Sequence, residues 1–176
     1  MRRRHPLPTR WLMTDERLGE ALPAVVAQLP RGSGVVFRHY ATPAGERRRL
    51  FEQVRRIARA RALVLLVAGP AFPGANGVHG RTARNATGLA TRPVHSMRER
   101  IAAEQAGVDA IFVSPVFATR SHPGAPALGR VRFQGLIRGA RVPVIALGGM
   151  TVARARTLKG IAGWAAIDAW GLELRA

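Results

Sequence analysis

The sequence predicts an α/β protein of the (β/α)8 TIM-barrel class, small and with trimmed helices. Short apolar segments alternate along the chain with helical or loop segments, and eight apolar segments can be counted. Eight parallel strands close this kind of barrel. Because 176 residues are few for such a barrel, several helices must be shortened. A doubly wound sheet is the alternative, which is weakened because no Gly-x-Gly-x-x-Gly motif follows the first strand.

The predicted strands are short. The third, at residues 62–68, is apolar throughout, as expected for a strand covered on both faces. The fourth and fifth are expected at 77–79 and 88–95, and the segment "GPAFPGAN" before them is too broken by proline and glycine for a full helix. The other five strands are predicted at 11–15, 34–38, 110–113, 143–147 and 164–167.

Helix signals lie between these strands. Residues 18–29 carry apolar side chains at helical spacing. A second helix is expected to begin with Thr42 as N-cap and Pro43 in its first turn. Ser96 and Glu99 form the pattern of a capping box for a third helix. The second helix is expected to bury Leu50, Val54, Ile57 and Ala58 and to direct its arginines outward.

Length and composition limit the classes of protein to which the chain can belong. The length predicts one domain spanning residues 1–176, and the absence of cysteine excludes disulfides, zinc–thiolate sites and cysteine nucleophiles. No apolar run approaches the roughly 18 to 20 residues that span a bilayer, and no signal-peptide segment follows the basic start. We therefore expect a cytoplasmic protein without a membrane partner. Whether it forms a homo-oligomer is left open.

The net charge of +18 raises the question of nucleic-acid binding. Lys159 is the only lysine among 28 basic residues, a pattern typical of a compositional bias toward arginine. The arginines are dispersed, aromatic residues make up 6% of the chain, and no RNA-recognition motif is present. A solvated basic surface is therefore favoured over nucleic-acid binding.

The chemistry of a parallel barrel lies where its strands run into the following loops. In this chain those positions are rich in arginine, histidine and glycine and poor in carboxylate, which suits an anion better than a cation. They include Thr14, Asp15, Arg38, His39, Tyr40, His79, His95, Ser114, Gly148, Gly149 and Asp168.

Two stretches carry a family resemblance. "GVDAIFVSPVFATRSHPGAPALG" and "VPVIALGGM", together with "LMTD", "VVFR" and "VHSMRE", resemble the thiamine phosphate synthase family, including its thiazole tautomerase branch, over nearly the whole chain. The resemblance implies that the protein is a diverged member that joins hydroxymethylpyrimidine pyrophosphate to thiazole phosphate, forming thiamine phosphate and pyrophosphate. Its partners would be phosphorylated pyrimidine and thiazole molecules.

The resemblance also assigns roles to individual residues. Arg38 matches the arginine that meets the pyrophosphate, and His122 stands where the family has a lysine, so these two are the catalytic candidates. Asp168 replaces a serine, and Tyr40 replaces a lysine. The expected substrate- and phosphate-binding residues are Thr119, Ser121, Gly148, Gly149, Tyr40 and Asp168.

The magnesium site that the resemblance implies lacks its ligands. The third strand of the family ends in Asn-Asp, but here it ends in Ala68 and Gly69. The segment "GRTARN" after the fourth strand offers no carboxylate. We therefore predict no metal ligand and no cofactor. For Asp15 and Asp168, salt bridges to nearby arginines are favoured, while Arg81, Arg84 and Arg92 could supply positive charge in place of the metal.

Three functional hypotheses follow. The first is a thiamine phosphate synthase with altered or impaired activity, and the second is a family member that binds a phosphorylated ligand without this reaction. Nucleic-acid binding is the third and least favoured. In the tautomerase branch a histidine stands at the position of Ser114, so that activity lacks an obvious base here. For His79 and His95 a packing role is favoured.

Overall fold

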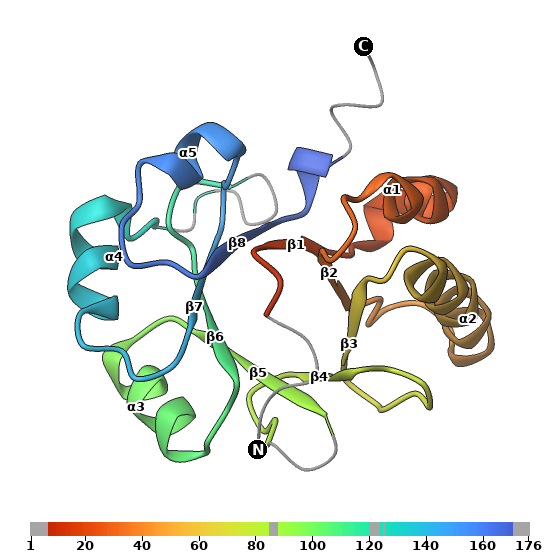
Figure 1. The fold of residues 1–176 in the computed structure, drawn as a ribbon, viewed down its shortest axis with the longest axis horizontal. Coiled ribbons are helices and arrows are strands. Elements are labelled where there is room, and N and C mark those ends of the chain that lie inside the picture. The colour runs from red at the N-terminus through yellow and green to blue at the C-terminus, as the bar shows by residue number, and fades with distance from the viewer. Residues whose placement is uncertain (1–6, 85–87, 120–123, 125, 171–176) are drawn as a thin grey trace.

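The eight strands of the computed structural model form one closed parallel barrel (Figure 1). The structure describes residues 7–84, 88–119, 124 and 126–170. Each strand pairs with the next in parallel, and the eighth closes the barrel by pairing with the first. This confirms the (β/α)8 prediction, because a doubly wound sheet would leave two open edges.

The strands are four to six residues long, apart from a three-residue β4. The polar residues expected at strand ends lie just beyond the last paired residues, so that Asp15 caps the following turn instead of ending the first strand. The strands are β1 Arg10–Met13, β2 Gly34–Phe37, β3 Val64–Ala68, β4 Gly77–His79, β5 Leu89–Val94, β6 Ala110–Val113, β7 Val144–Leu147 and β8 Gly163–Ala166.

The helices form an incomplete outer layer. No helix lies between β3 and β4, nor among the described residues between β4 and β5, which confirms the expected trimming. Within the described part of the chain, no helix has the length and apolarity to cross a membrane. The helices are η1 Glu16–Ala21, α1 Leu22–Gln28, α2 Ala44–Ala60, α3 Met97–Gln105, α4 Gly129–Ile137, α5 Val152–Arg156 and η2 Asp168–Trp170.

Helix α2 departs from the sequence prediction in two ways. Pro43, with φ −53° and ψ 143°, is itself the N-cap, so Thr42 lies outside the helix and does not cap it. The arginines do not all point outward, because Arg47 is buried. The apolar face is also rotated slightly, so that Phe51 is fully buried whereas Leu50 and Ile57 are only partly so.

Helix α3 begins as the capping pattern predicts. The Ser96 hydroxyl accepts a hydrogen bond from the backbone N–H of Glu99 at 3.2 Å. The Glu99 carboxylate accepts from the backbone N–H of His95, one residue before the cap. These two bonds fix the backbone of His95 at the carboxyl end of β5.

Three apolar clusters hold the barrel together. One packs α1 and α2 against β1 to β3, and another packs α3, α4 and α5 against β5 to β8. The third fills the barrel interior with inward-facing side chains, as expected for a barrel of eight strands. Its buried members are Trp11, Met13, Val36, Val64, Leu66, Ala68, Ala110, Phe112, Ile145 and Ala165.

Candidate functional site

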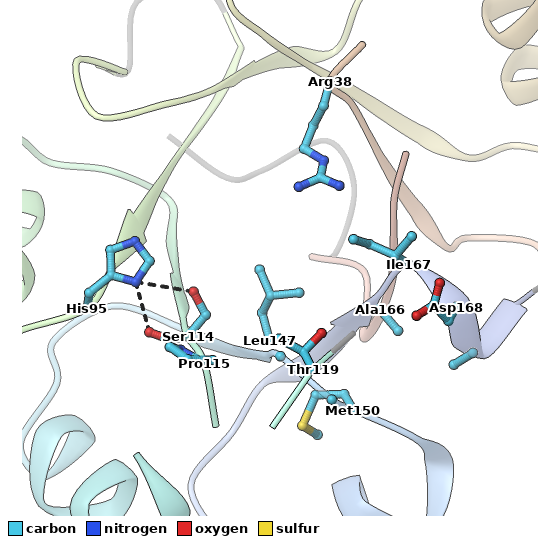
Figure 2. Close-up of a pocket in the computed structure, with 13 residues that line it drawn as sticks. Arg38, His95, Ser114, Pro115, Thr119, Leu147, Met150, Ala166, Ile167 and Asp168 are labelled. Atoms are coloured by element: carbon cyan, nitrogen blue, oxygen red, sulfur yellow. Dashed lines mark hydrogen bonds between the residues drawn. The ribbon is translucent and has the colours of Figure 1, made fainter. Parts of the chain in front are cut away.

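A pocket of about 260 Å³ opens at the carboxyl ends of the strands, where parallel barrels carry their chemistry (Figure 2). Side chains from β2, β5, β6, β7 and β8, or from the loops that follow them, line it. The polar part of the lining consists of Arg38, His95, Ser114, Thr119, Asp168 and the Gly148–Gly149 turn.

One wall of the pocket is apolar. Leu147 ends β7, and Met150 follows the glycine turn, with Ile167 on the neighbouring strand end. These side chains can pack against a flat ring without offering it a hydrogen bond. The pocket therefore combines an apolar surface with a few polar groups at its edges, as ligand sites commonly do.

Arg38 follows β2 and directs its guanidinium into the barrel mouth (Figure 2). Nε donates to the backbone carbonyl of Thr14 at 2.6 Å, and Nη2 pairs with the Asp15 carboxylate at 3.1 Å. Burial lowers the pKa of Arg38, and the charge of Asp15 acts in the opposite direction. An arginine stays protonated under such conditions, so the pocket has a fixed cation on this side.

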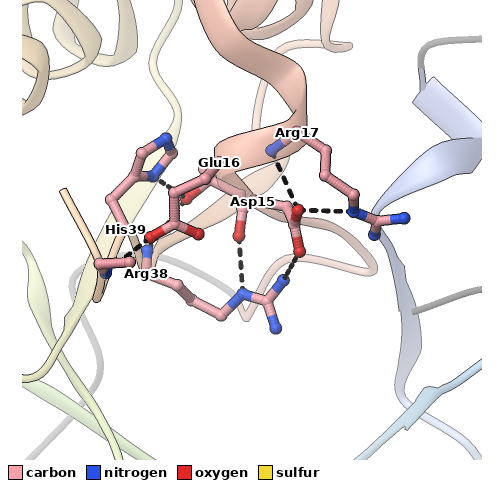
Figure 3. Close-up of polar contacts among 7 residues, drawn as sticks. Asp15, Glu16, Arg17, Arg38 and His39 are labelled. Carbon is pink, nitrogen blue, oxygen red and sulfur yellow. Dashed lines mark hydrogen bonds and ion pairs between the residues drawn. The ribbon is translucent and has the colours of Figure 1, made fainter. Parts of the chain in front are cut away.

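Asp15 lies between two arginines (Figure 3). Its carboxylate accepts from Nε of Arg17 at 2.7 Å and from Nη2 of Arg38 at 3.1 Å. Burial acts to raise the pKa of Asp15, but the hydrogen bonds and positive charges of the two arginines outweigh it and leave the pKa below its usual value. The expected salt bridges to arginine are confirmed for this carboxylate.

The turn after β7 requires glycine at both positions. Gly148 and Gly149 have φ values of 96° and 59°, in the left-handed region. A Cβ on Gly148 would lie 2.7 Å from Cα of Pro115, and a Cβ on Gly149 would lie 2.4 Å from the carbonyl oxygen of Ala118. The missing side chains therefore let the loop after β6 pack directly on the turn, which brings Thr119 to the same pocket.

His95 lies in the pocket, so the packing role predicted for it is wrong. Its Nδ1 is 2.8 Å from the carbonyl oxygen of Ser114 and 3.4 Å from the hydroxyl of the same residue (Figure 2). A carbonyl can only accept, so in the neutral ring Nδ1 carries the proton and Nε2 is an acceptor. The sequence signal was its position directly after a strand, before a helix cap.

The other strand-end histidines are structural. His79 is buried, with Nδ1 2.9 Å from the Thr91 hydroxyl and its ring edge-on to Phe112 at 4.9 Å, which confirms the predicted packing role. Burial, with a smaller contribution from the charge of Arg38, lowers the pKa of His79 to about 3. His39 stacks on Phe37 at 4.8 Å and is also buried.

The comparison with protein families decides the identity of the barrel. A family model described as thiamine monophosphate synthase matches residues 11–170. This chain belongs to the thiamine monophosphate synthase family. The match covers every strand of the barrel except for the first residue of β1.

One sequence relative and two solved structures resemble this chain. The chain is 40% identical over 57 residues to a putative thiamine-phosphate synthase 2 of Aquifex aeolicus (strain VF5), a match that spans 32% of this chain and 31% of that protein. The thiamine phosphate pyrophosphorylase structure from Pyrococcus furiosus superposes with a TM-score of 0.78 at 24% identity, covering 93% of this chain and 86% of that one. An HpcH/HpaI aldolase/citrate lyase family protein from Burkholderia cenocepacia shares the barrel more distantly, with a TM-score of 0.62, 20% identity and 95% and 91% coverage.

Of the remaining residues assigned by resemblance to the synthase family, the structure describes Asp168 and Tyr40. Asp168 begins η2 and lines the pocket. Tyr40 is 65% exposed on the rim and does not line it. Ser121 and His122 lie outside the described residues.

The residues present do not fit the magnesium site that the family implies. Among residues 7–84, 88–119, 124 and 126–170, no three histidines or carboxylates cluster to hold a metal ion. Two of the three arginines that could have supplied charge in place of the metal are directed elsewhere. Arg92 donates to the carbonyl of Ala83 at 2.8 Å, and Arg84 lines a groove on the outside of β4.

Proposed function

We propose that the protein is a thiamine phosphate synthase that transfers the pyrimidinylmethyl group of hydroxymethylpyrimidine pyrophosphate to the ring nitrogen of thiazole phosphate. A carbon–nitrogen bond forms, the carbon–oxygen bond to the diphosphate breaks, and pyrophosphate leaves with the bonding electrons. The observation that carries this proposal is the lining of one pocket. The Arg38 guanidinium and the Gly148–Gly149 turn both border this pocket, and apolar side chains form the wall between them.

The thiazole phosphate is assigned to the glycine turn. Backbone at such a turn can approach a phosphate closely, because no side chain intervenes. The Thr119 hydroxyl borders the same part of the pocket and can donate to a phosphate oxygen. The apolar residues Leu147 and Met150 lie next to the turn and suit the ring of the same molecule.

The diphosphate is assigned to the Arg38 side. Charge builds on the departing diphosphate in the transition state, and a guanidinium that is already fixed in place stabilises that charge without reorganising. Thr14 and Asp15 hold the Arg38 side chain in this position. Asp168 would repel a phosphate, so its carboxylate is better suited to accept a hydrogen bond from an amino group attached to the pyrimidine ring.

The direct test is turnover. The purified protein is mixed with hydroxymethylpyrimidine pyrophosphate and thiazole phosphate, and thiamine phosphate is measured by chromatography. We expect thiamine phosphate and pyrophosphate in equal amounts. Binding of thiazole phosphate without product at high protein concentration would instead support a binding protein built on the same pocket.

A further inference from the structure

A buried arginine occupies the carboxyl ends of β2 and β3. Arg47, in the first turns of α2, has a side chain that donates three hydrogen bonds to backbone carbonyls. Nε donates to His39 at 3.0 Å, and Nη2 donates to Arg38 at 3.2 Å and to Ala68 at 2.7 Å. The guanidinium therefore joins the ends of two neighbouring strands.

No carboxylate of the described residues contacts this guanidinium directly, although the charge of Glu16 acts on it from a distance. Arg47 is 6% exposed and forms no ion pair with any residue that the structure describes. Its guanidinium carbon lies 4.8 Å from the ring centre of Phe72 and 5.4 Å from that of Phe37, so aromatic faces and carbonyl dipoles surround it. Its Nη1 donates to no residue in the described part of the chain.

The strand end beside Arg47 is also the end at which family members carry a metal-ligand carboxylate. Here that position is Gly69, with a φ of 86°. A Cβ built on Gly69 would lie 3.6 Å from Nη2 of Arg47 and 3.7 Å from the ring of Tyr40. The chain thus carries no carboxylate at this position, and the Arg47 guanidinium lies beside it.

We propose that the diphosphate half of the mouth works without a divalent cation, and that Arg47 supplies beside β3 the positive charge that the family obtains from the metal. The inference rests on the proposed function, because it concerns the diphosphate of the same reaction. Arg38 contacts the anion, whereas Arg47 fixes the Arg38 backbone and adds its own charge to the strand ends. Arg47 is in this sense a positioning residue.

The first experiment uses the unaltered protein and inorganic pyrophosphate. Isothermal titration is carried out in EDTA and again in excess magnesium. We expect pyrophosphate to bind in EDTA, with equal or weaker affinity in magnesium because the metal competes for the anion in solution. An affinity gain of more than about threefold with magnesium, or no binding in either buffer, would overturn the proposal.

The second experiment separates charge from architecture. Arg47→Met removes the cation, Arg47→Lys keeps it without the planar fork, and the exposed neighbour Arg48→Met is matched for loss of one positive charge. For variants that retain the circular dichroism spectrum of the parent, we expect Arg47→Met to bind pyrophosphate at least about tenfold more weakly. Arg47→Lys and Arg48→Met should stay within about threefold of the parent.

The two proposals fail in different ways. Unchanged pyrophosphate affinity in a folded Arg47→Met protein would reduce Arg47 to a structural clamp and overturn the inference, while leaving the synthase reaction intact. Absence of thiamine phosphate in the turnover assay would remove the proposed reaction without affecting metal-free pyrophosphate binding. If Arg47→Met does not fold, the titration of the unaltered protein still decides whether a metal is needed. A loss of pyrophosphate affinity greater than about threefold in folded Arg47→Lys, which keeps the charge, would overturn the role of Arg47.

Discussion

Nη2 of Arg47 donates a hydrogen bond of 3.2 Å to the backbone carbonyl of Arg38. One arginine, on the buried face of α2, thus holds the backbone of a second arginine that faces the pocket. Thr14 adds to this support, because its hydroxyl accepts from the backbone N–H of Arg38 at 2.9 Å. The anion-binding side of the mouth is therefore preorganised by contacts on both sides of the β2 strand end.

Replacement of Arg38 should weaken anion binding more than it weakens the fold. In Arg38→Met we expect pyrophosphate affinity to fall about tenfold or more, since a charge-assisted hydrogen bond contributes about 1.5–3 kcal/mol. Arg17→Met is the matched control, because Arg17 pairs with the same Asp15 carboxylate but does not line the pocket. Isothermal titration of both variants checks this, and equal losses in the two would contradict the assignment.

The requirement for glycine in the turn after β7 can be tested by an alanine substitution, which adds one methyl group. Gly149→Ala places Cβ against the carbonyl of Ala118 at a φ of 59°, so we expect a loss of about 1–3 kcal/mol in the free energy of unfolding. Thiazole phosphate binding should fall with it. Gly135→Ala in α4 is the control, where an added Cβ meets no neighbour and about 0.5–1 kcal/mol should be gained. Urea titrations measure both, and a fully stable Gly149→Ala protein with normal binding would refute the turn's role.

His95 should occupy a single tautomer. Because Nδ1 donates to the Ser114 carbonyl, nitrogen NMR of the neutral ring should show a proton on Nδ1 and none on Nε2. The acceptor Nε2 is then available to a ligand donor in the pocket. A ring protonated on Nε2 in the same spectrum would contradict the geometry. The spectrum of His95→Asn identifies which signals belong to this residue.

The depressed pKa of His79 predicts how stability changes with pH. The unfolded chain takes up a proton near pH 6.5, whereas the folded chain does so only at about 3, so stability is lost as the pH falls through this window. Between pH 7 and 5 the parent should lose about 2 kcal/mol more than His79→Asn. Urea unfolding at the two pH values measures this difference. Parallel losses in both proteins would show that His79 titrates normally.

The barrel was predictable from the sequence because most of its strands are short apolar runs that begin or end near proline, glycine or a polar residue. The absence of a helix between β3 and β4 could also be inferred from the glycines and prolines of that segment. The start of α2 could not, because Thr42 and Pro43 fit a cap pattern whose register depends on the backbone angles of Pro43. The burial of Arg47 could not be predicted either. Its partners are backbone carbonyls and aromatic rings from distant segments, and no spacing in the sequence links them to Arg47.

Part of the candidate site could be predicted from the sequence, because several of its residues directly follow strands and the barrel backbone fixes their positions. Gly148, Gly149 and Thr119 could be placed together because their segments match a family pattern and both follow strands of one barrel. His95 was misjudged because a histidine after a strand can turn to either side, and only the carbonyl of Ser114 decides which. The chain contains so many arginines that the sequence could not show which of Arg47, Arg84 and Arg92 lies at the ends of the strands.

Turnover is the measurement that tests the central claim most directly. The protein is incubated with hydroxymethylpyrimidine pyrophosphate and thiazole phosphate, with EDTA in one arm and magnesium in the other, and Arg38→Met is assayed in parallel. We predict that thiamine phosphate forms in both arms and that Arg38→Met forms it far more slowly. No thiamine phosphate in either arm, from protein that binds thiazole phosphate, would contradict the assignment as a synthase.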